Sequence, residues 1–365
     1  MKITIIGGGN IGTLAAAKIS LNHDVTLYTN KSWNNIIEVY NHNNELLYKS
    51  NYITVTADIK SAIEDADIII STYPSNLTEN IIKEINKFQK RLKYLILEPG
   101  FGGKEFHCSN LIEKGVTIIG MQRVHAISRI KETGKSVYFL GGRKCLNIAS
   151  IPNSNNKESK LIMEELFENK TNILPNYLCV TLTPSNSILH TARLYSMFNN
   201  NEYYEKDPLF YEEWNDSASE ILFKSDDEEQ RILKCINKID LTSVESLKKY
   251  YESETPKKLT KKIKSIEAFK GISSPTILTE KGFTYDLKSR YFFEDFPYGI
   301  LIIKGFAEIC NIDTPQIDEI INWYQQISNK EYLIDNKLKG KDLIETGIPQ
   351  NYGLKKVEDI YKYYV

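Results

Sequence analysis

The first twelve residues, MKITIIGGGNIG, constrain the fold of this chain more than any other stretch. Residues 3–6 are typical of a buried strand, and the small and apolar residues up to Ile19 predict a helix. Between the two, Gly7 permits a tight turn, Gly9 lets the backbone approach a pyrophosphate, and Gly12 lets the helix pack closely on the strand. The free N–H groups at the start of such a helix attract phosphate. We therefore predict a dinucleotide-binding unit here; the alternative is a glycine-rich turn that binds nothing.

Strand and helix patterns alternate after this turn, with strands expected at 24–28, 67–71, 94–97 and 116–120 and a closing strand pair at 136–142 and 146–149. The chain has 365 residues, which is too long for one ordinary core. Later segments carry helical spacing instead, at 186–200, 207–224, 226–239, 243–252, 257–270, 298–311, 314–328 and 355–364. The expected fold is α/β: a Rossmann-type parallel-sheet domain over residues 1–176, followed by an all-α substrate and catalytic domain over 177–365.

Composition excludes several classes of partner. The net charge is −1, so neither nucleic acid nor an anionic membrane surface is expected to bind. No apolar run reaches the roughly 18 residues that cross a bilayer, and since a strand is predicted from the first residues, we expect no signal peptide. The five cysteines are scattered without metal-ligand spacing, so we expect reduced thiols, no metal site and a cytoplasmic location.

The residues after the second strand bear on the choice of cofactor. An NAD site usually places an acidic residue there, to bind the ribose 2′-hydroxyl. Here the position holds Thr29, Asn30, Lys31 and Ser32, which include no carboxylate and one cation that could neutralise a 2′-phosphate. The sequence therefore favours NADP, with NAD as the alternative if Lys31 is only a solvated loop charge.

Four further residues are expected at the cofactor. Asn10 and Ile11 stand inside the glycine turn, where the first helix begins. Pro74 and Ser75 follow the strand at 67–71, and ligands of open α/β sheets lie beyond the carboxyl ends of the strands. We expect Pro74 and Ser75 near the nicotinamide ribose.

Two segments of the second half could carry chemistry. Asn186 and His190 are four residues apart and share one face if the segment is helical. A histidine can cycle a proton near neutral pH, which the reduction of a carbonyl or imine requires. The second segment holds Arg290 and Asp295: an arginine fork can bind a carboxylate, and a carboxylate can orient a histidine. The alternatives are a histidine without a role and a structural ion pair.

These segments resemble those of the opine dehydrogenases, the octopine/nopaline dehydrogenase group. The run RYFFEDFPYG, residues 290–299, resembles the Arg-x-x-x-x-Asp-x-Pro-Tyr-Gly signature of that family. Residues 186–190 are similar to its Asn-Pro-Ile-x-His-Pro motif, 98–103 to its Pro-Gly-x-x-Gly turn, and 122–129 to a segment that borders its active site. The resemblance extends over nearly the whole chain.

The resemblance implies a reductive condensation, in which an α-keto acid such as pyruvate and the amine of an amino acid form an imine that NAD(P)H reduces. His190 would then exchange the proton and Asp295 would orient it. Arg290 would hold a substrate carboxylate, Gln122 would contact the keto acid, and Asn186 would help to position the reacting group. The partners would be these small molecules, and a homodimer through the helical domain is possible.

The chain also departs from the family pattern. Ser187 and Thr191 replace two prolines that flank the motif histidine, and the segment before Arg129 lacks the usual proline–aromatic pair. Two other functions stay open: a 2-keto-acid reductase of the ketopantoate-reductase type, and a non-catalytic NADP-binding sensor. An opine synthase whose product chelates a metal is a third variant, because such a metal leaves no ligand cluster in the enzyme.

Overall fold

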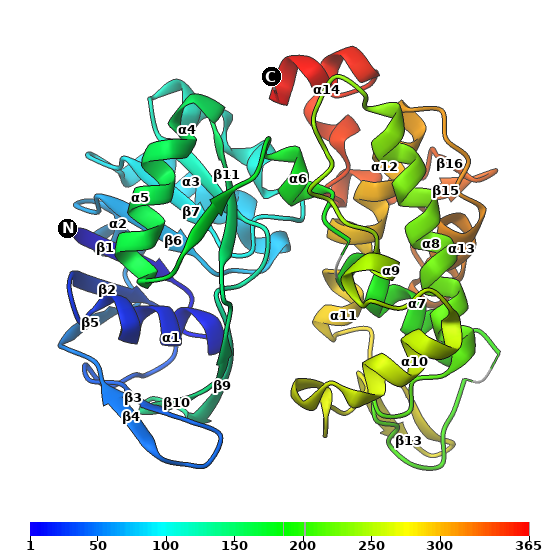
Figure 1. Cartoon of the computed structure of the whole chain (residues 1–365), viewed down its shortest axis with the longest axis horizontal. Coiled ribbons are helices and arrows are strands. Elements are labelled where there is room, and N and C mark those ends of the chain that lie inside the picture. Colours follow the sequence, from blue (N-terminus) through cyan, green and yellow to red (C-terminus); the bar gives the residue numbers. More distant parts are fainter. Residues whose placement is uncertain (185, 201, 365) are drawn as a thin grey trace. The chain divides into compact units, whose positions relative to one another are not determined.

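The computed structural model of this chain describes residues 1–184, 186–200 and 202–364. It divides into two compact units, Met1–Thr181 and Leu182–Val365 (Figure 1). The predicted boundary after residue 176 lies slightly before this division, because the short helix α6 (Leu178–Thr181) belongs with the first unit.

The first unit is built on an eight-stranded sheet in the order β12-β11-β8-β7-β6-β1-β2-β5. All neighbouring strands pair in parallel except β11 and β8, which are antiparallel. The strands are β1 (Lys2–Ile6), β2 (Asp24–Tyr28), β5 (Ile53–Thr56), β6 (Ile68–Ser71), β7 (Tyr94–Leu97), β8 (Thr117–Met121), β11 (Leu146–Ile151) and β12 (Thr171–Ile173). The predicted Rossmann-type sheet is confirmed.

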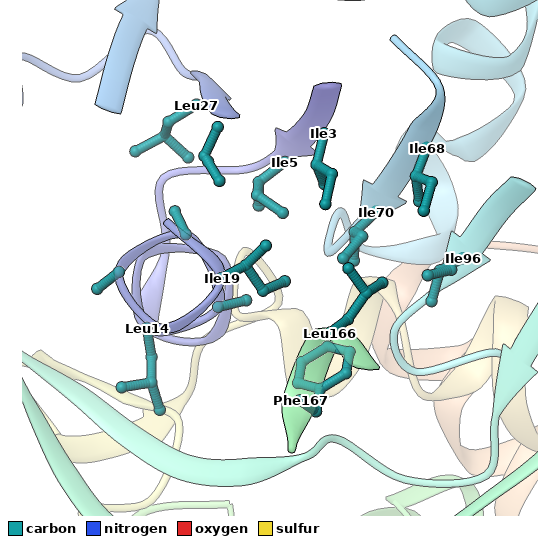
Figure 2. Close-up of a cluster of buried hydrophobic side chains, with 14 of the residues drawn as sticks. Ile3, Ile5, Leu14, Ile19, Leu27, Ile68, Ile70, Ile96, Leu166 and Phe167 are labelled. Carbon is teal, nitrogen blue, oxygen red and sulfur yellow. The ribbon is translucent and has the colours of Figure 1, made fainter. Parts of the chain in front are cut away.

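Helices pack their apolar faces on this sheet. They are α1 (Asn10–Ile19), α2 (Ile59–Ile63), α3 (Thr78–Phe88), α4 (Ser109–Glu113) and α5 (Asn156–Phe167). Figure 2 shows the core that forms where α1 and α5 meet the strands: Ile19 of α1 and Leu166 of α5 lie beside Ile5 and Ile70 of the sheet, whereas Leu14 points away from these strands. Each such buried side chain contributes about 1.5–3 kcal/mol. This packing fixes the start of α1 against the carboxyl end of β1.

A second, four-stranded sheet in the order β4-β3-β10-β9 belongs to the same unit. Its strands are β3 (Glu38–Tyr40), β4 (Leu46–Lys49), β9 (Ala126–Glu132) and β10 (Ser136–Gly142). The predicted closing pair at 136–142 and 146–149 is therefore wrong: β10 pairs with β9 and β3, whereas β11 pairs with β8. Two adjacent apolar strands do not reveal which sheet each one joins.

The second unit is mainly helical. Its helices are α7 (Asn186–Phe198), α8 (Asp216–Cys235), α9 (Leu247–Tyr250), α10 (Pro256–Ser265), α11 (Arg290–Phe293), α12 (Leu301–Ile309), α13 (Pro315–Ser328) and α14 (Val357–Tyr364). Two small hairpins, β13 (Thr276–Thr279) with β14 (Gly282–Tyr285) and β15 (Leu333–Ile334) with β16 (Lys337–Leu338), add strands to a domain predicted to be all helix. Across the described residues, no helix has both the length and the apolar character needed to span a bilayer.

One predicted helix break is also wrong. Helices were expected at 207–224 and 226–239, but α8 runs without interruption from Asp216 to Cys235. The acidic residues 226–229 lie inside this helix, and the carboxyl groups of Asp226 and Glu229 are buried. No glycine or proline stands in α8, so nothing in its backbone ends it.

Candidate active site

The glycine turn has the shape of a phosphate cradle. Gly7 has φ +120°, in a region that L side chains rarely adopt, and a Cβ on Gly12 would run into the Gly7 carbonyl oxygen. Helix α1 starts after Gly9, which caps it without a side chain, and its first turn carries no acidic residue. A Cβ on Gly9 would meet nothing within 4 Å. The backbone N–H groups at this helix start are thus exposed to an incoming anion, which fits a pyrophosphate.

The loop after β2 presents one cation outward. The buried Thr29 hydroxyl accepts the backbone N–H of Lys31 at 3.1 Å, while Asn30 and Lys31 are exposed. Within the turn, Asn10 uses its side-chain oxygen to accept the Ile130 N–H at 2.8 Å, and Ile11 is half-buried. Asn10 can therefore meet the cofactor through its backbone, because its side-chain oxygen is bonded to β9.

The loops after β6 and β7 are joined by a lysine that the sequence did not single out. Pro74 is half-buried and Ser75 buried, directly beyond the end of β6. Lys104 is buried, and its ammonium donates to the carbonyl oxygens of Tyr73 at 2.8 Å and Pro99 at 3.1 Å. This contact fixes both loops at the sheet edge where nicotinamides bind in such folds.

The second unit brings His190 and Asp295 together, although they are far apart in the sequence. His190 lies on α7, and Asp295 directly precedes the helical turn η5 (Phe296–Ile300). The His190 Nδ1 and the Asp295 Oδ2 are 2.8 Å apart, and both residues are buried. Burial raises the pKa of Asp295 above its ordinary value, and the adjacent imidazole acts in the opposite direction. A histidine oriented by a buried carboxylate is the arrangement that proton exchange requires.

The other ring nitrogen of His190 meets a residue that sequence reasoning missed. The Tyr211 hydroxyl lies 2.9 Å from the Nε2, and the Tyr211 ring stacks on Phe269 with centroids 4.0 Å apart. Burial, followed by the neighbouring Tyr291, raises the pKa of Tyr211 well above its ordinary value. Tyrosine is too frequent in this chain, with 23 copies, for its type alone to have marked this one.

Arg290 pairs with a neighbour on its own segment. Its Nε and Nη2 donate to Glu294 Oε2 at 3.0 and 2.7 Å. The structural ion pair considered for Arg290 and Asp295 is thus formed with Glu294 instead. The Arg290 side chain is 65% exposed, so a substrate can still reach it.

The two remaining predicted residues, Asn186 and Gln122, belong to different units. Asn186 is the first residue of α7, one turn before His190, and is half-buried. Gln122 belongs to the first unit, where its side-chain oxygen accepts the Asn147 amide at 2.9 Å. Within the described parts of the chain, no group of three or more histidine, cysteine or acidic side chains could hold a metal ion.

Comparison with known proteins covers both units. Residues 2–139 match the model of the NAD-dependent glycerol-3-phosphate dehydrogenase N-terminus, and residues 173–328 match the NAD/NADP octopine/nopaline dehydrogenase α-helical domain. The helical match includes the segment that carries both His190 and Asp295. The chain belongs to the opine dehydrogenase family.

Individual relatives agree with this assignment. The chain is 28% identical to tauropine dehydrogenase of Arabella iricolor, over 84% of this chain and 82% of the relative. It is also 28% identical to opine dehydrogenase of Haliotis discus hannai, over 98% of each. A structure of octopine dehydrogenase with NADH and L-arginine superposes with a TM-score of 0.84 at 24% identity, covering 99% of this chain and 97% of the other.

The family fixes the class of reaction. The chain is an NAD(P)-dependent oxidoreductase that acts on CH–NH bonds. Its reaction is the reductive condensation of an α-keto acid with an amine. The two alternative functions, a 2-keto-acid reductase and a non-catalytic sensor, are less well supported, because the helical domain matches the opine family and retains the His190–Asp295 pair.

Proposed function

We propose that this opine dehydrogenase uses His190 as its proton donor and acceptor, with Asp295 as the group that orients it. The observation that supports this most directly is the 2.8 Å contact between the His190 Nδ1 and the buried Asp295 carboxylate. The carboxylate accepts the Nδ1 proton, which leaves the Nε2 to exchange protons.

The proton has two tasks in this chemistry. An amino acid enters as its ammonium form, and the amine must lose a proton before it attacks the carbonyl of the keto acid. The resulting carbinolamine must then receive a proton on its hydroxyl group, which leaves as water when the imine forms. A histidine can take the first proton and return it for the second step. His190 is suited to both.

Arg290 holds a carboxylate of the substrate in this proposal. Glu294 accepts from its Nε and Nη2, so the Nη1 donors remain for a ligand. Asn186, one helical turn before His190, would position the reacting group. Gln122, whose side-chain oxygen accepts from the Asn147 amide, would contact the keto acid.

The cofactor we propose is NADPH, which supplies the hydride that reduces the imine. Gly7, Gly9 and Gly12, with Asn10 and Ile11, would hold the pyrophosphate at the start of α1. Thr29, Asn30 and Lys31 would face the ribose 2′-phosphate, and Pro74 and Ser75 the nicotinamide ribose. The exposed Lys31 and the absence of an acidic residue from 29 to 32 favour NADPH over NADH.

We also propose that the enzyme is cytoplasmic and that it forms a homodimer. The described cysteines are all free thiols, as expected in a reducing compartment. Light scattering of the purified protein measures the oligomeric state.

A cofactor-oxidation screen tests this function. NADPH and NADH are each offered with α-keto acids crossed with amino acids, and the products are identified by mass spectrometry. We expect oxidation that needs both organic substrates and gives a product with the summed mass of the two, less one oxygen atom. Oxidation by the keto acid alone, at a rate that amino acids do not change, would refute the proposal.

A further inference from the structure

His190 does not present its second nitrogen directly to an open space. Asp295 accepts the Nδ1 proton, so the Nε2 is the acceptor of the neutral ring, and the Tyr211 hydroxyl donates to it at 2.9 Å. Any proton that leaves or reaches the Nε2 in this arrangement meets the Tyr211 oxygen first.

Tyr211 is held rigidly at this place. It is buried, its ring stacks on Phe269, and Phe210 packs against its edge with centroids 4.9 Å apart. Arg193, one turn after His190 on α7, donates its Nε–H to the Phe210 carbonyl at 2.9 Å. The helix that carries His190 therefore also fixes the backbone beside Tyr211.

A second phenol, that of Tyr291, lies beside the same imidazole. After burial, Tyr291 is the largest cause of the raised pKa of Tyr211. The Tyr291 ring lies against the His190 imidazole, with centroids 4.3 Å apart and the planes inclined by 33°. Tyr291 is half-buried, whereas Asp295, His190 and Tyr211 are buried. Hydrogen bonds run from the Asp295 carboxylate through His190 to the Tyr211 hydroxyl, and Tyr291, the more accessible residue, covers the imidazole.

We propose that Tyr211 is a catalytic residue that carries protons between the His190 Nε2 and the substrate, with Tyr291 as a positioning residue that packs on the imidazole. This inference rests on the proposed role of His190. It assigns the atom that touches the substrate to a tyrosine oxygen.

The proton transfers balance at each step. During activation of the amine, the substrate ammonium gives a proton to the Tyr211 oxygen while the Tyr211 proton passes to His190 Nε2, so that the phenol is restored and the imidazole becomes imidazolium. During dehydration, Tyr211 gives its proton to the carbinolamine hydroxyl and takes the Nε2 proton of His190. The C–O bond breaks, water leaves with the bonding pair, and the nitrogen lone pair forms the C=N bond.

The phenol form suits this role. Because burial raises the pKa of Tyr211 far above neutrality, its hydroxyl stays protonated between steps. It can then pass a proton only as it receives another, so the two transfers are coupled. The charge stays on His190, where the Asp295 carboxylate offsets it.

Tyr211→Phe tests the proposal with little change in packing. We expect kcat to fall by about 10²-fold or more, with NADPH binding by fluorescence titration unchanged. The matched control is Tyr195→Phe, a buried tyrosine on the same helix as His190, whose hydroxyl donates to Glu319 at 2.7 Å. The control should stay within about twofold of the wild-type kcat, because its hydroxyl has no contact with His190.

Rates in mixtures of H₂O and D₂O separate a relay from a positioning role. In the wild type we expect kcat to fall along a curve as the deuterium fraction rises, since two protons move together, and in Tyr211→Phe along a straight line. A Tyr211→Phe enzyme as active as Tyr195→Phe overturns the relay, and so does a slow variant whose deuterium dependence matches that of the wild type. A wild-type enzyme that forms no opine would contradict the proposed function instead.

Discussion

The chemistry of this site depends on how single side chains are held. His190 is useful only while its imidazole keeps one orientation, and Asp295 supplies that constraint from a different segment of the chain. Neither residue is exposed, so solvent does not compete for the contact.

Replacement of His190 tests its role directly. We expect His190→Ala to lower turnover by about 10²-fold or more, because the imidazole that takes up the proton is removed. The affinity for NADPH should stay nearly the same, since the glycine turn belongs to the first unit. Steady-state kinetics and fluorescence titration measure the two quantities, and unchanged turnover would remove His190 from the mechanism.

Replacement of Arg290 tests the second predicted role. Arg290→Leu should raise the KM of the keto acid by roughly tenfold or more with a smaller effect on kcat, since the lost contact is a charge-assisted bond to a carboxylate. Lys288→Leu is the control, because Lys288 is an exposed cation two residues away. Equal KM values in the two variants would mean that Arg290 only pairs with Glu294.

At the scale of elements, α8 contains carboxyl groups that are costly to bury. Burial raises the pKa of Asp226 to about 7 and that of Glu229 well above its ordinary value. Asp226 Oδ2 accepts the Leu247 N–H at 2.9 Å, which ties α8 to the start of α9. Both groups favour folding when protonated, because an unfolded chain would ionise them near pH 4.

This gives a stability prediction with a definite sign. The protonated Asp226 makes its full stabilising contribution to the free energy of unfolding below about pH 4, and this contribution is lost as the pH rises through about 7. Asp226→Asn, which can still accept the Leu247 N–H, should therefore be more stable than the wild type at pH 8 by on the order of 1–3 kcal/mol, with a smaller difference at pH 5. Calorimetric unfolding at both pH values measures this.

The control for α8 is Glu220→Gln, which changes an exposed carboxyl on the same helix. It should unfold like the wild type at both pH values. An Asp226→Asn protein that is no more stable at pH 8 than Glu220→Gln would show that the buried Asp226 carboxyl does not lower the free energy of unfolding.

Sequence periodicity predicted most elements for a physical reason. The strands of the parallel sheet are apolar on both faces and the helices bury one stripe, so both patterns are local. The errors arose where structure depends on distant partners. Strands β10 and β11 belong to different sheets, and α8 continues through residue 225, where two separate helices were predicted.

The residues of the candidate site could likewise be predicted from the sequence only in part. The residues His190 and Asp295 could be predicted because their motifs resemble a family pattern, and the structure joins them. Tyr211 and Lys104 could not, because each acts through a contact that the fold creates: the phenol of a turn with a histidine on helix α7, and the ammonium with two loop carbonyls.

At the scale of the whole molecule, the first unit must select its cofactor and the second its organic substrates. We expect Lys31→Glu to lower the kcat/KM for NADPH by tenfold or more while that for NADH changes little, because a carboxylate there would repel the 2′-phosphate. The control is Lys93→Glu. Lys93 is an exposed cation directly before β7, at the amino end of that strand. An unchanged NADPH-to-NADH ratio would mean that Lys31 is a solvated loop charge.

The central claim is that NADPH transfers hydride to the carbon of an imine and that His190 acts as the proton donor and acceptor. The most direct measurement supplies NADPH deuterated at the transferable C4 position, together with a keto acid and an amino acid, and locates the label by NMR. The account predicts deuterium on the product carbon that joins the former keto acid to the amine nitrogen. Deuterium found only in a 2-hydroxy acid would contradict it.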